Sequence, residues 1–267
     1  MNTATPLFSL DKSACLRDKR CVDACPVRLL AVDAEGYPEA VPGAAERCMD
    51  CGHCVAVCTT CALSHARLPQ KDFLPAQAAQ AAPEALDALV RNRRSIRNYR
   101  REALPRETLR ELMEVARYAP TAINTRHVRW HVTTNAEATR RLAGLVSAWT
   151  TEVGYMPQAL PVWEAGGDLA LRGAPHVAYC TAPEDYDWAW SDCAIAVTTL
   201  DLAATARGLG TCWAGLFTFA ARHHAPLREA LALPEGTGVF GALMFGKPRE
   251  AYPRVPPRPG DIVTWID

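Results

Sequence analysis

The sequence lacks an excess of charge of either sign, a long apolar run and a recognisable export signal. Lys+Arg and Asp+Glu each number 29 in 267 residues, so the formal net charge is zero and no global basic field exists to bind nucleic acid. Asp192 and Asp201 interrupt the most apolar stretch, which excludes a bilayer-spanning helix there. The segment MNTATPLFSLDK has neither a basic region nor a long apolar region. We therefore expect no export, no membrane association and a cytoplasmic location.

Hydrophobic residues make up 49% of the chain and charged residues 22%, a balance that excludes wholesale disorder and allows one or two domains. The cysteines are unevenly spread. There are eleven, and eight of them lie between Cys15 and Cys61. Without an export signal, clustered cysteines indicate metal or cluster ligands before disulfides.

Composition divides the chain into three parts. Residues 1–68 are rich in cysteine, residues 69–84 are rich in Ala, Gln and Pro and are predicted to be a linker, and residues 85–267 form a larger domain. Helices are expected to begin near Pro83 and over Arg106–Tyr118, with Pro105 in the first turn. A buried helix is expected over Asp192–Arg207, ended by Gly208 and Gly210.

Short strands are predicted at Trp130–Thr134, His176–Cys180 and Val239–Phe245. Residues 147–166 are expected to be an irregular lid whose apolar side chains suit a substrate pocket wall. The Pro-rich tail, residues 247–267, is predicted to be an extended arm that docks on a neighbouring surface.

The second cysteine run has the spacing C-x2-C-x2-C-x3-C, which is the bacterial ferredoxin run for iron–sulfur clusters. Its members are Cys48, Cys51, Cys54 and Cys58. Gly52 suits a tight wrap around inorganic sulfide. The first run follows the same frame, with a Pro after its last cysteine and an aspartate in its second position; its members are Cys15, Asp18, Cys21 and Cys25.

Together the runs resemble a two-cluster, bacterial-type ferredoxin over about residues 8–66. The resemblance implies that one cluster uses Cys15, Asp18, Cys21 and Cys58, and the other Cys48, Cys51, Cys54 and Cys25. Asp18 is a hard oxygen ligand that either binds iron weakly or leaves a [3Fe–4S] cluster. Thr59 replaces the usual Pro, and Cys61 is either an alternative ligand or, as we favour, a small buried side chain. A pair of zinc sites is the alternative, but zinc usually takes two separated pairs of ligands.

The larger domain contains Arg93, Arg94, Ser95 and Arg97 within five residues, a compact site for an anion because guanidinium matches phosphate geometry. Alone, such a run is more typical of a solvated basic stretch. Four further segments accompany it: 119–124, 167–175, 208–215 and 245–248.

In this order the segments resemble the FMN-dependent nitroreductase family over about residues 86–267, and the whole chain resembles ferredoxin-fused nitroreductases. The resemblance implies an α+β fold with a mostly antiparallel central sheet wrapped by helices. It also implies a homodimer with FMN at the interface, with the C-terminal arm reaching the partner.

Residue by residue, the resemblance places Arg93, Arg94, Ser95 and Arg97 on the FMN phosphate, ribityl chain or polar edge. Pro120, Thr121 and Asn124 would lie at the flavin, with Asn124 contacting the isoalloxazine ring from the partner subunit. Gly210, Thr211 and Trp213 would line its other side, although core packing is an equal reading of Trp213. Arg258 is a candidate phosphate ligand, with Arg249 and Arg254 as competitors. Cys180, Cys193 and Cys212 are expected to be buried structural thiols.

Arg126 and His127 stand where the family usually has Gln-Pro. They could bind an acidic substrate or favour anionic reduced flavin, and His127 could donate a proton; the alternative, which we favour, is that both face solvent or contact phosphate. No other catalytic residue is predicted.

The combination predicts an oxidoreductase that passes electrons from a ferredoxin-type donor through the clusters to FMN, and then to a nitroaromatic, quinone or activated alkene. Reverse flow, as in a dehydrogenase or aromatising oxidase, and an iron–sulfur redox sensor remain open. No G-x-G-x-x-G follows a predicted strand, so we expect poor use of NAD(P)H.

Overall fold

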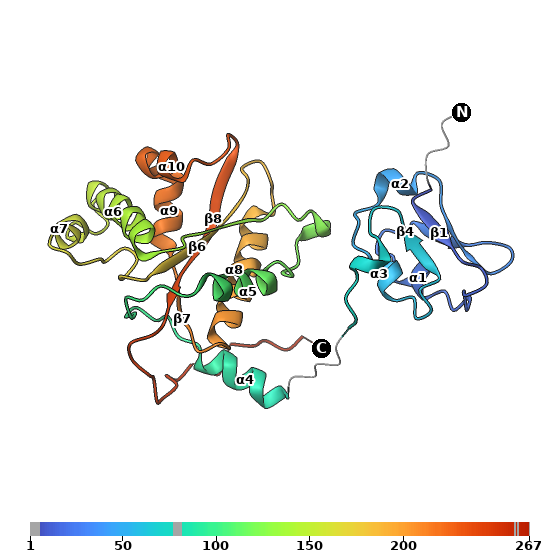
Figure 1. The fold of residues 1–267 in the computed structure, drawn as a ribbon, viewed down its shortest axis with the longest axis horizontal. Helices are drawn as coiled ribbons and strands as arrows, with labels where there is room; N and C mark the ends of the chain where they lie inside the picture. The colour runs from blue at the N-terminus through green and yellow to red at the C-terminus, as the bar shows by residue number, and fades with distance from the viewer. Residues whose placement is uncertain (1–5, 77–81, 259, 261, 267) are drawn as a thin grey trace. The chain divides into compact units, whose positions relative to one another are not determined.

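The computed structural model of the chain describes residues 6–76, 82–258, 260 and 262–266. Its contacts divide the chain into two units, Met1–Gln80 with Ile123–Thr125, and Ala81–Ala122 with Arg126–Asp267. Each unit is described by itself (Figure 1). Residues 77–81, which lie within the predicted linker of residues 69–84, are outside the described residues.

Unit 1 is built from two small antiparallel sheets and short helical turns. Strand β1 (Phe8–Leu10) pairs with β4 (Leu63–His65), and β2 (Leu30–Val32) pairs with β3 (Pro38–Ala40). The helical turns are α1 (Arg20–Asp23), α2 (Ala44–Arg47), α3 (His53–Ala56) and η1 (Gln70–Asp72). The central buried cluster of this unit is small and consists of Cys21, Leu30, Cys54, Val55 and Leu63. Two of these five side chains are thiols, so little apolar area holds the unit together.

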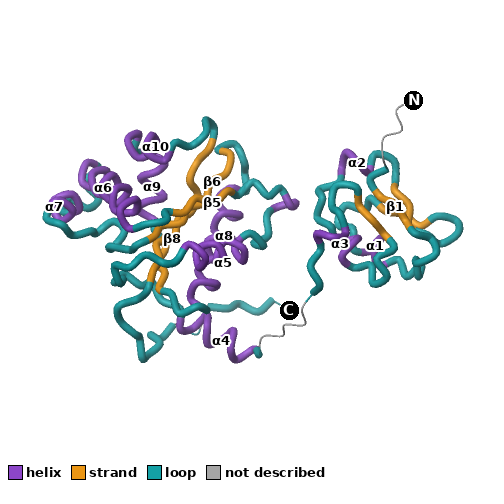
Figure 2. Tube along the Cα trace, in the orientation of Figure 1, coloured by secondary structure: helices purple, strands orange, loops and turns teal. Residues whose placement is uncertain are grey.

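Unit 2 contains a four-stranded antiparallel sheet in the order β5-β6-β8-β7. Figure 2 shows the strands of this sheet in orange among the helices of the unit. Its strands are β5 (Arg129–Val132), β6 (His176–Pro183), β7 (Gly210–Trp213) and β8 (Thr237–Gly246). Its helices are α4 (Pro83–Asn92), α5 (Arg106–Ala116), α6 (Ala136–Glu152), α7 (Ala159–Glu164), α8 (Ala189–Thr205), α9 (Gly215–His223) and α10 (Ala225–Leu231). The short turn η2 (Ala122–Asn124) begins in this unit, and its last two residues are grouped with unit 1. This confirms the predicted α+β class with a mostly antiparallel sheet.

Both faces of the central strands are covered, which is why β6 and β8 read as continuous apolar runs rather than alternating ones. Residues of α6, α9 and α10 form one core with the sheet, and residues of α5 and α8 form the other. A register shift between Cys180 and Thr181 leaves an extra residue on β8, so Phe240 faces one core while Val239 and Ala242 face the other.

Several sequence predictions need correction. Pro105 caps α5 from outside rather than standing in its first turn, whereas Pro83 does occupy the first turn of α4. The predicted irregular lid is partly helical, since it contains the end of α6 and all of α7. Gly210 begins β7, a strand that the sequence reading missed, and only Gly208 lies at the end of α8.

Helix α8 is buried on one side only. Asp192, Cys193 and Leu200 are buried, but Trp190 is 47% and Ile195 is 41% exposed. The prediction of a helix buried around its circumference is therefore wrong for the single chain. The described part of the tail beyond Pro248 has no helix or strand and is exposed, as predicted for an extended arm.

Candidate functional site

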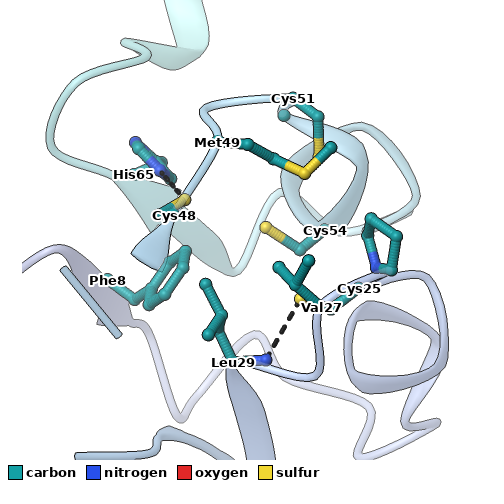
Figure 3. A pocket seen from close by; sticks show the side chains of 11 residues that line it. Phe8, Cys25, Val27, Leu29, Cys48, Met49, Cys51, Cys54 and His65 are labelled. Carbon is teal, nitrogen blue, oxygen red and sulfur yellow. Dashed lines mark hydrogen bonds between the residues drawn. The ribbon is translucent and has the colours of Figure 1, made fainter. Parts of the chain in front are cut away.

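Four cysteine side chains of unit 1 converge on one small pocket (Figure 3). They are Cys25, Cys48, Cys51 and Cys54. Cys54 is 8% exposed, and burial, reinforced by Cys25 and Cys51, raises the pKa of its thiol to about 11. Thiolates this close can ionise together only when a cation is bound between them. The donor set therefore fits an iron–sulfur cluster or a metal ion.

A second group of thiols surrounds Cys21. This side chain is also 8% exposed, and burial, with smaller contributions from Cys58 and Cys15, raises the pKa of its thiol. Cys58 thus lies beside the first run rather than beside its own. The structure brings the cysteines together in the crossed arrangement that the ferredoxin resemblance implies.

The two runs share a backbone repeat of 33 residues, from Cys15 to Cys48 (48 − 15 = 33). Helix α1 and strand β2 recur at this offset as α3 and β4. Left-handed φ angles also recur at this offset: Arg17 (54°) and Asp50 (50°), Lys19 (62°) and Gly52 (73°), Arg28 (54°) and Cys61 (55°). Asp18 therefore occupies the backbone position that corresponds to Cys51.

The Asp18 carboxylate has a local partner. Its Oδ1 accepts a hydrogen bond from the Arg20 backbone N–H at 3.3 Å, and its Oδ2 lies 3.3 Å from Arg20 Nε. The side chain is 36% exposed. A carboxylate with a cationic partner and access to water binds soft iron less firmly than a thiolate does. Its role as a ligand stays a prediction, and these contacts indicate that it would bind iron weakly.

His65 is a polar side chain that the sequence reading missed. Its Nδ1 accepts a hydrogen bond from the Arg67 backbone N–H at 3.1 Å, so the neutral ring carries its proton on Nε2. Nε2 lies 3.4 Å from Cys48 Sγ and 3.5 Å from Asp50 Oδ1. Burial lowers the pKa of His65. A buried N–H beside a ligand sulfur tunes a cluster's reduction potential. His65 lies on β4, which pairs with β1, so its place beside Cys48 depends on the fold and not on sequence spacing.

Cys61 differs from the prediction of a buried side chain, because it is exposed. Its backbone carbonyl accepts a hydrogen bond from Gln70 Nε2 at 2.6 Å. Its φ of 55° shows that the chain turns here in a conformation that glycine would adopt more easily. The three other cysteines, Cys180, Cys193 and Cys212, are buried as predicted.

In unit 2 the arginine segment runs beside strand β7. Ser95 forms a parallel bridge with Thr211, and the Ile96 backbone N–H donates to the Thr211 carbonyl at 2.8 Å. Arg93 Nε lies 2.9 Å from Asp201 Oδ2. This pairing holds the segment against the end of the sheet.

Arg94 has buried donors without a partner. Its Nη1 donates to the Arg93 carbonyl at 2.6 Å, but Nε and Nη2 are buried and make no hydrogen bond to any residue that the structure describes. Unpartnered buried guanidinium donors are costly unless an anion binds them. The site therefore fits a phosphate group. Arg97 is exposed, and its Nη1 contacts only the Ser95 carbonyl, at 3.3 Å, among the described residues.

The residues predicted on β7 have separate roles. Gly210 has no room for a side chain, since a Cβ there would lie 2.7 Å from the Ile96 side chain. The Thr211 hydroxyl is buried and donates to Asp201, and the Thr211 carbonyl is held by the Ile96 N–H. Trp213 is 42% exposed and lines an apolar pocket with Trp149, Tyr155 and Phe219. The core-packing reading of Trp213 is therefore wrong.

A buried carboxylate fixes the loop after α5. Asp192 accepts from the Ala122 backbone N–H at 3.1 and 3.2 Å and from the Tyr186 hydroxyl at 2.7 Å. Thr121 Oγ1 accepts from the Arg126 backbone N–H at 3.0 Å. The sequence reading treated Asp192 only as a break in an apolar run and missed this positioning role.

The remaining predicted residues of this loop are less enclosed. The exposed residues are Pro120, Arg126 and His127. His127 lies edge-on to Tyr186, with ring centroids 4.9 Å apart. Asn124 is half-buried with a φ of 57°, and its predicted contact from a partner subunit stays a prediction.

The three tail arginines predicted as alternative phosphate ligands, Arg249, Arg254 and Arg258, lie in different surroundings. Arg249 donates its backbone N–H to the Asn98 carbonyl at 3.1 Å and lines a pocket with three other arginines. Arg93, Arg94 and Arg97 do not line that pocket. Arg254 and Arg258 are exposed.

Comparison with known families matches both parts of the chain. The model of the nitroreductase family matches residues 90–247, and that of a 4Fe-4S dicluster domain matches residues 7–59. Nitroreductase NfnB of Mycolicibacterium smegmatis is 32% identical over 172 residues, spanning 51% of this chain and 73% of that protein. Chloronitrobenzene nitroreductase of Comamonas testosteroni is 26% identical over 197 residues, spanning 60% and 86%.

Among solved structures, an FMN-bound nitroreductase of Bacteroides fragilis superposes with a TM-score of 0.62 at 21% identity. The match covers 70% of this chain and all of that one. At this identity the likeness concerns the fold. In the part of the chain that the structure describes, no helix combines the length and apolar character needed to span a bilayer.

Proposed function

This chain belongs to the nitroreductase family and joins to it a 4Fe-4S dicluster domain, and from that premise we propose that it carries electrons from a ferredoxin-type donor through two iron–sulfur clusters to FMN and on to an organic acceptor. The acceptor is a conjugated molecule: a nitroaromatic, a quinone or an activated alkene. Clusters carry single electrons and flavin exchanges them for pairs, which is the chemistry that these groups supply when bound.

The observation that carries the proposal is the convergence of Cys25, Cys48, Cys51 and Cys54 on one pocket. A structural zinc site would satisfy one such group of four thiols. The second group around Cys21, with its oxygen ligand Asp18 at the position of Cys51, fits a pair of redox clusters better than a pair of structural ions. In this proposal the cysteines bind the clusters, and His65 donates a hydrogen bond toward Cys48.

The FMN site is proposed beside β7. The unpartnered donors of Arg94 would bind the flavin phosphate, supported by Arg93 and Arg97. Asp201 orients Arg93, and Asp192 holds the loop that begins at Thr121. The FMN named with the Bacteroides fragilis structure supports this choice of flavin.

The acceptor would bind against the apolar pocket of about 810 Å³ that includes Trp213 and Phe219. Such a pocket suits a flat conjugated molecule and keeps water from it. The apolar side chains exposed on α8, Trp190 and Ile195, favour a second copy of the chain as their cover. We therefore include a homodimer in the proposal.

The test uses full-length protein purified without oxygen. Iron, sulfide, zinc and flavin are measured per chain, and the flavin is then followed by absorbance on addition of reduced ferredoxin, alone and with a nitroaromatic or a quinone. We expect about eight irons and one FMN per chain, flavin reduction by ferredoxin, and reoxidation by the acceptor.

Other outcomes select the alternatives. Zinc without sulfide would overturn the electron route through the first unit. Fast oxidation of NADPH would show that the clusters are not the sole entry for electrons. Flavin reduced by an organic substrate, with electrons leaving to oxidised ferredoxin, would establish the reverse reaction. Cluster loss that changes assembly without any turnover would establish a sensor.

A further inference from the structure

A pocket of unit 2 gathers four arginines that the proposed function does not use. Its volume is about 460 Å³, within the range of small-molecule sites. Its lining residues are Asn98, Tyr99, Arg100, Arg101, Arg172, Gly173 and Arg249. No carboxylate lines it, so the pocket concentrates positive charge on a chain whose formal net charge is zero.

No carboxylate of a described residue is paired with any of the four guanidinium groups, although Glu102 and Glu250 adjoin Arg101 and Arg249 in the sequence. Within the described residues, none of them forms a side-chain hydrogen bond or an ion pair. Two arginines on and directly after helix α5 behave differently, since Arg110 pairs with Glu107 at 2.6 Å and Arg117 with Glu114 at 3.1 Å. Four unpaired like charges around one concavity repel one another, and a bound anion would relieve that repulsion.

Three separate segments form this pocket, and backbone contacts hold two of them together. The Arg100 backbone N–H donates to the Lys247 carbonyl at 2.8 Å, and the Arg249 N–H donates to the Asn98 carbonyl at 3.1 Å. Tyr99, which lies between, is 5% exposed and pairs with Pro248. Arg100 and Arg249 are therefore presented by a firm backbone.

The third segment is a turn organised by Asp168. This carboxylate accepts the backbone N–H groups of Ala170, Leu171 and Gly173 at 2.8–2.9 Å. The Asp168 carboxylate is therefore already bound to the backbone. Arg172 follows in the left-handed region with a φ of 61°, a conformation in which glycine would be less strained.

We propose that this pocket is a second anion site that binds a small polyphosphate, such as the diphosphate group of a nucleotide. Guanidinium forks match phosphate oxygens two by two, and four of them match the charge of a diphosphate better than that of a single carboxylate. The concave shape and the neutral net charge of the chain argue for a small molecule rather than a nucleic acid. The site is separate from the residues proposed to hold FMN.

The test is calorimetric titration of sodium pyrophosphate into the full-length holoprotein, with flavin and iron measured before and after. Arg100→Gln with Arg101→Gln removes two charges from the pocket. Arg110→Gln with Arg117→Gln removes two charges from α5 and its C-terminal cap and is the matched control. We expect the pocket variant to bind pyrophosphate at least about tenfold more weakly, because two charge-assisted hydrogen bonds are lost. The control should stay within about twofold of wild type.

Arg172→Gly tests whether pyrophosphate affinity falls without a loss of thermal stability. Glycine tolerates the left-handed backbone, so thermal stability should be equal or higher while pyrophosphate binding weakens. Citrate, an anion without phosphate, should bind more weakly than pyrophosphate. Adenosine diphosphate binding more tightly than pyrophosphate would identify a nucleotide as the source, and weaker binding would identify the inorganic anion.

No binding by wild type, an equal loss in the control pair, or equal binding of citrate would overturn the proposal. Pyrophosphate that releases the flavin would show that it occupies the flavin site instead. A protein that lacks flavin but binds pyrophosphate through Arg100 and Arg101 would refute the proposed FMN site and leave this one standing.

Discussion

The two cysteine runs of unit 1 follow the same backbone path although most of their side chains differ. At the offset of 33 residues, the first run has Asp18, Lys19 and Val32 where the second has Cys51, Gly52 and His65. Cys21 and Cys54 are buried to the same 8% in both. The comparison indicates that the backbone conformation around a cluster tolerates substitution. We expect the retention of iron and the reduction potential of each cluster to depend on single positions.

The largest effect is expected from removing a buried thiol. Cys54→Ala should lose about four irons per chain and unfold much of unit 1, because the core there has few apolar residues to compensate. The change is followed by iron analysis and circular dichroism. Cys61→Ala is the control, since that exposed cysteine lies outside both groups of four. Equal iron loss in both variants would show that Cys61 is a ligand.

Exchanging the residue types at the second positions of the runs, Asp18 and Cys51, should exchange how firmly the two clusters hold their iron. Asp18→Cys is expected to slow the loss of iron from the first cluster and to remove any [3Fe–4S] signal from the electron paramagnetic resonance spectrum. Cys51→Asp should introduce such a signal at the second cluster. Asp23→Cys, on α1, controls for an added thiol. An unchanged spectrum for Asp18→Cys would place Asp18 outside the coordination shell.

Gly52 tests whether the backbone of the second run needs glycine. Its φ is 73°, and a Cβ there would lie 3.2 Å from the Phe73 side chain. We expect Gly52→Ala to lower the free energy of unfolding of unit 1 by about 1 kcal/mol, measured by denaturation of the cluster-loaded protein. Lys19→Gly, at the corresponding site, should be neutral or stabilising. Destabilisation in both would contradict the equivalence of the two backbones.

His65→Val gives the second run the residue of the first. Loss of the N–H directed at Cys48 Sγ should lower the midpoint potential of the second cluster by some tens of millivolts, on the order of one hydrogen bond. Redox titration followed by electron paramagnetic resonance measures the shift. His53→Val, which changes an exposed histidine on α3, should leave both potentials unchanged; a matching shift there would remove the role assigned to His65.

In unit 2 a buried histidine is expected to make stability depend on pH. His176 is fully buried, accepts from the Leu104 N–H at 2.8 Å and contacts the Thr133 carbonyl at 2.7 Å. Burial lowers its pKa, so the folded unit binds fewer protons than the unfolded chain. Stability should therefore fall as pH drops below the unfolded histidine pKa of about 6.5. Thermal denaturation of His176→Gln should show a smaller dependence on pH; an unchanged dependence would assign it to other groups.

Much of the architecture could be predicted from the sequence. The strands β5, β6 and β8 have apolar runs long enough to recognise, and Pro83 and Gly208 are local signals for where helices begin and end. Strand β7 was missed because Gly210–Trp213 is short and has no alternation; it becomes a strand only by pairing with the end of β8. The exposed face of α8 could not be foreseen either, because its composition is apolar on all sides.

Spacing along the chain by itself determined the candidate cluster ligands and the arginine segment, since these depend on residues close together in sequence. Only the tertiary structure decided that Cys58 lies beside Cys21, that His65 meets Cys48, and that Arg249 joins Arg100 and Arg172 rather than Arg94. The physical reason is that hydrogen bonds and charge interactions act over a few ångströms in space. Residues tens of positions apart reach that range only when strands pair and loops close.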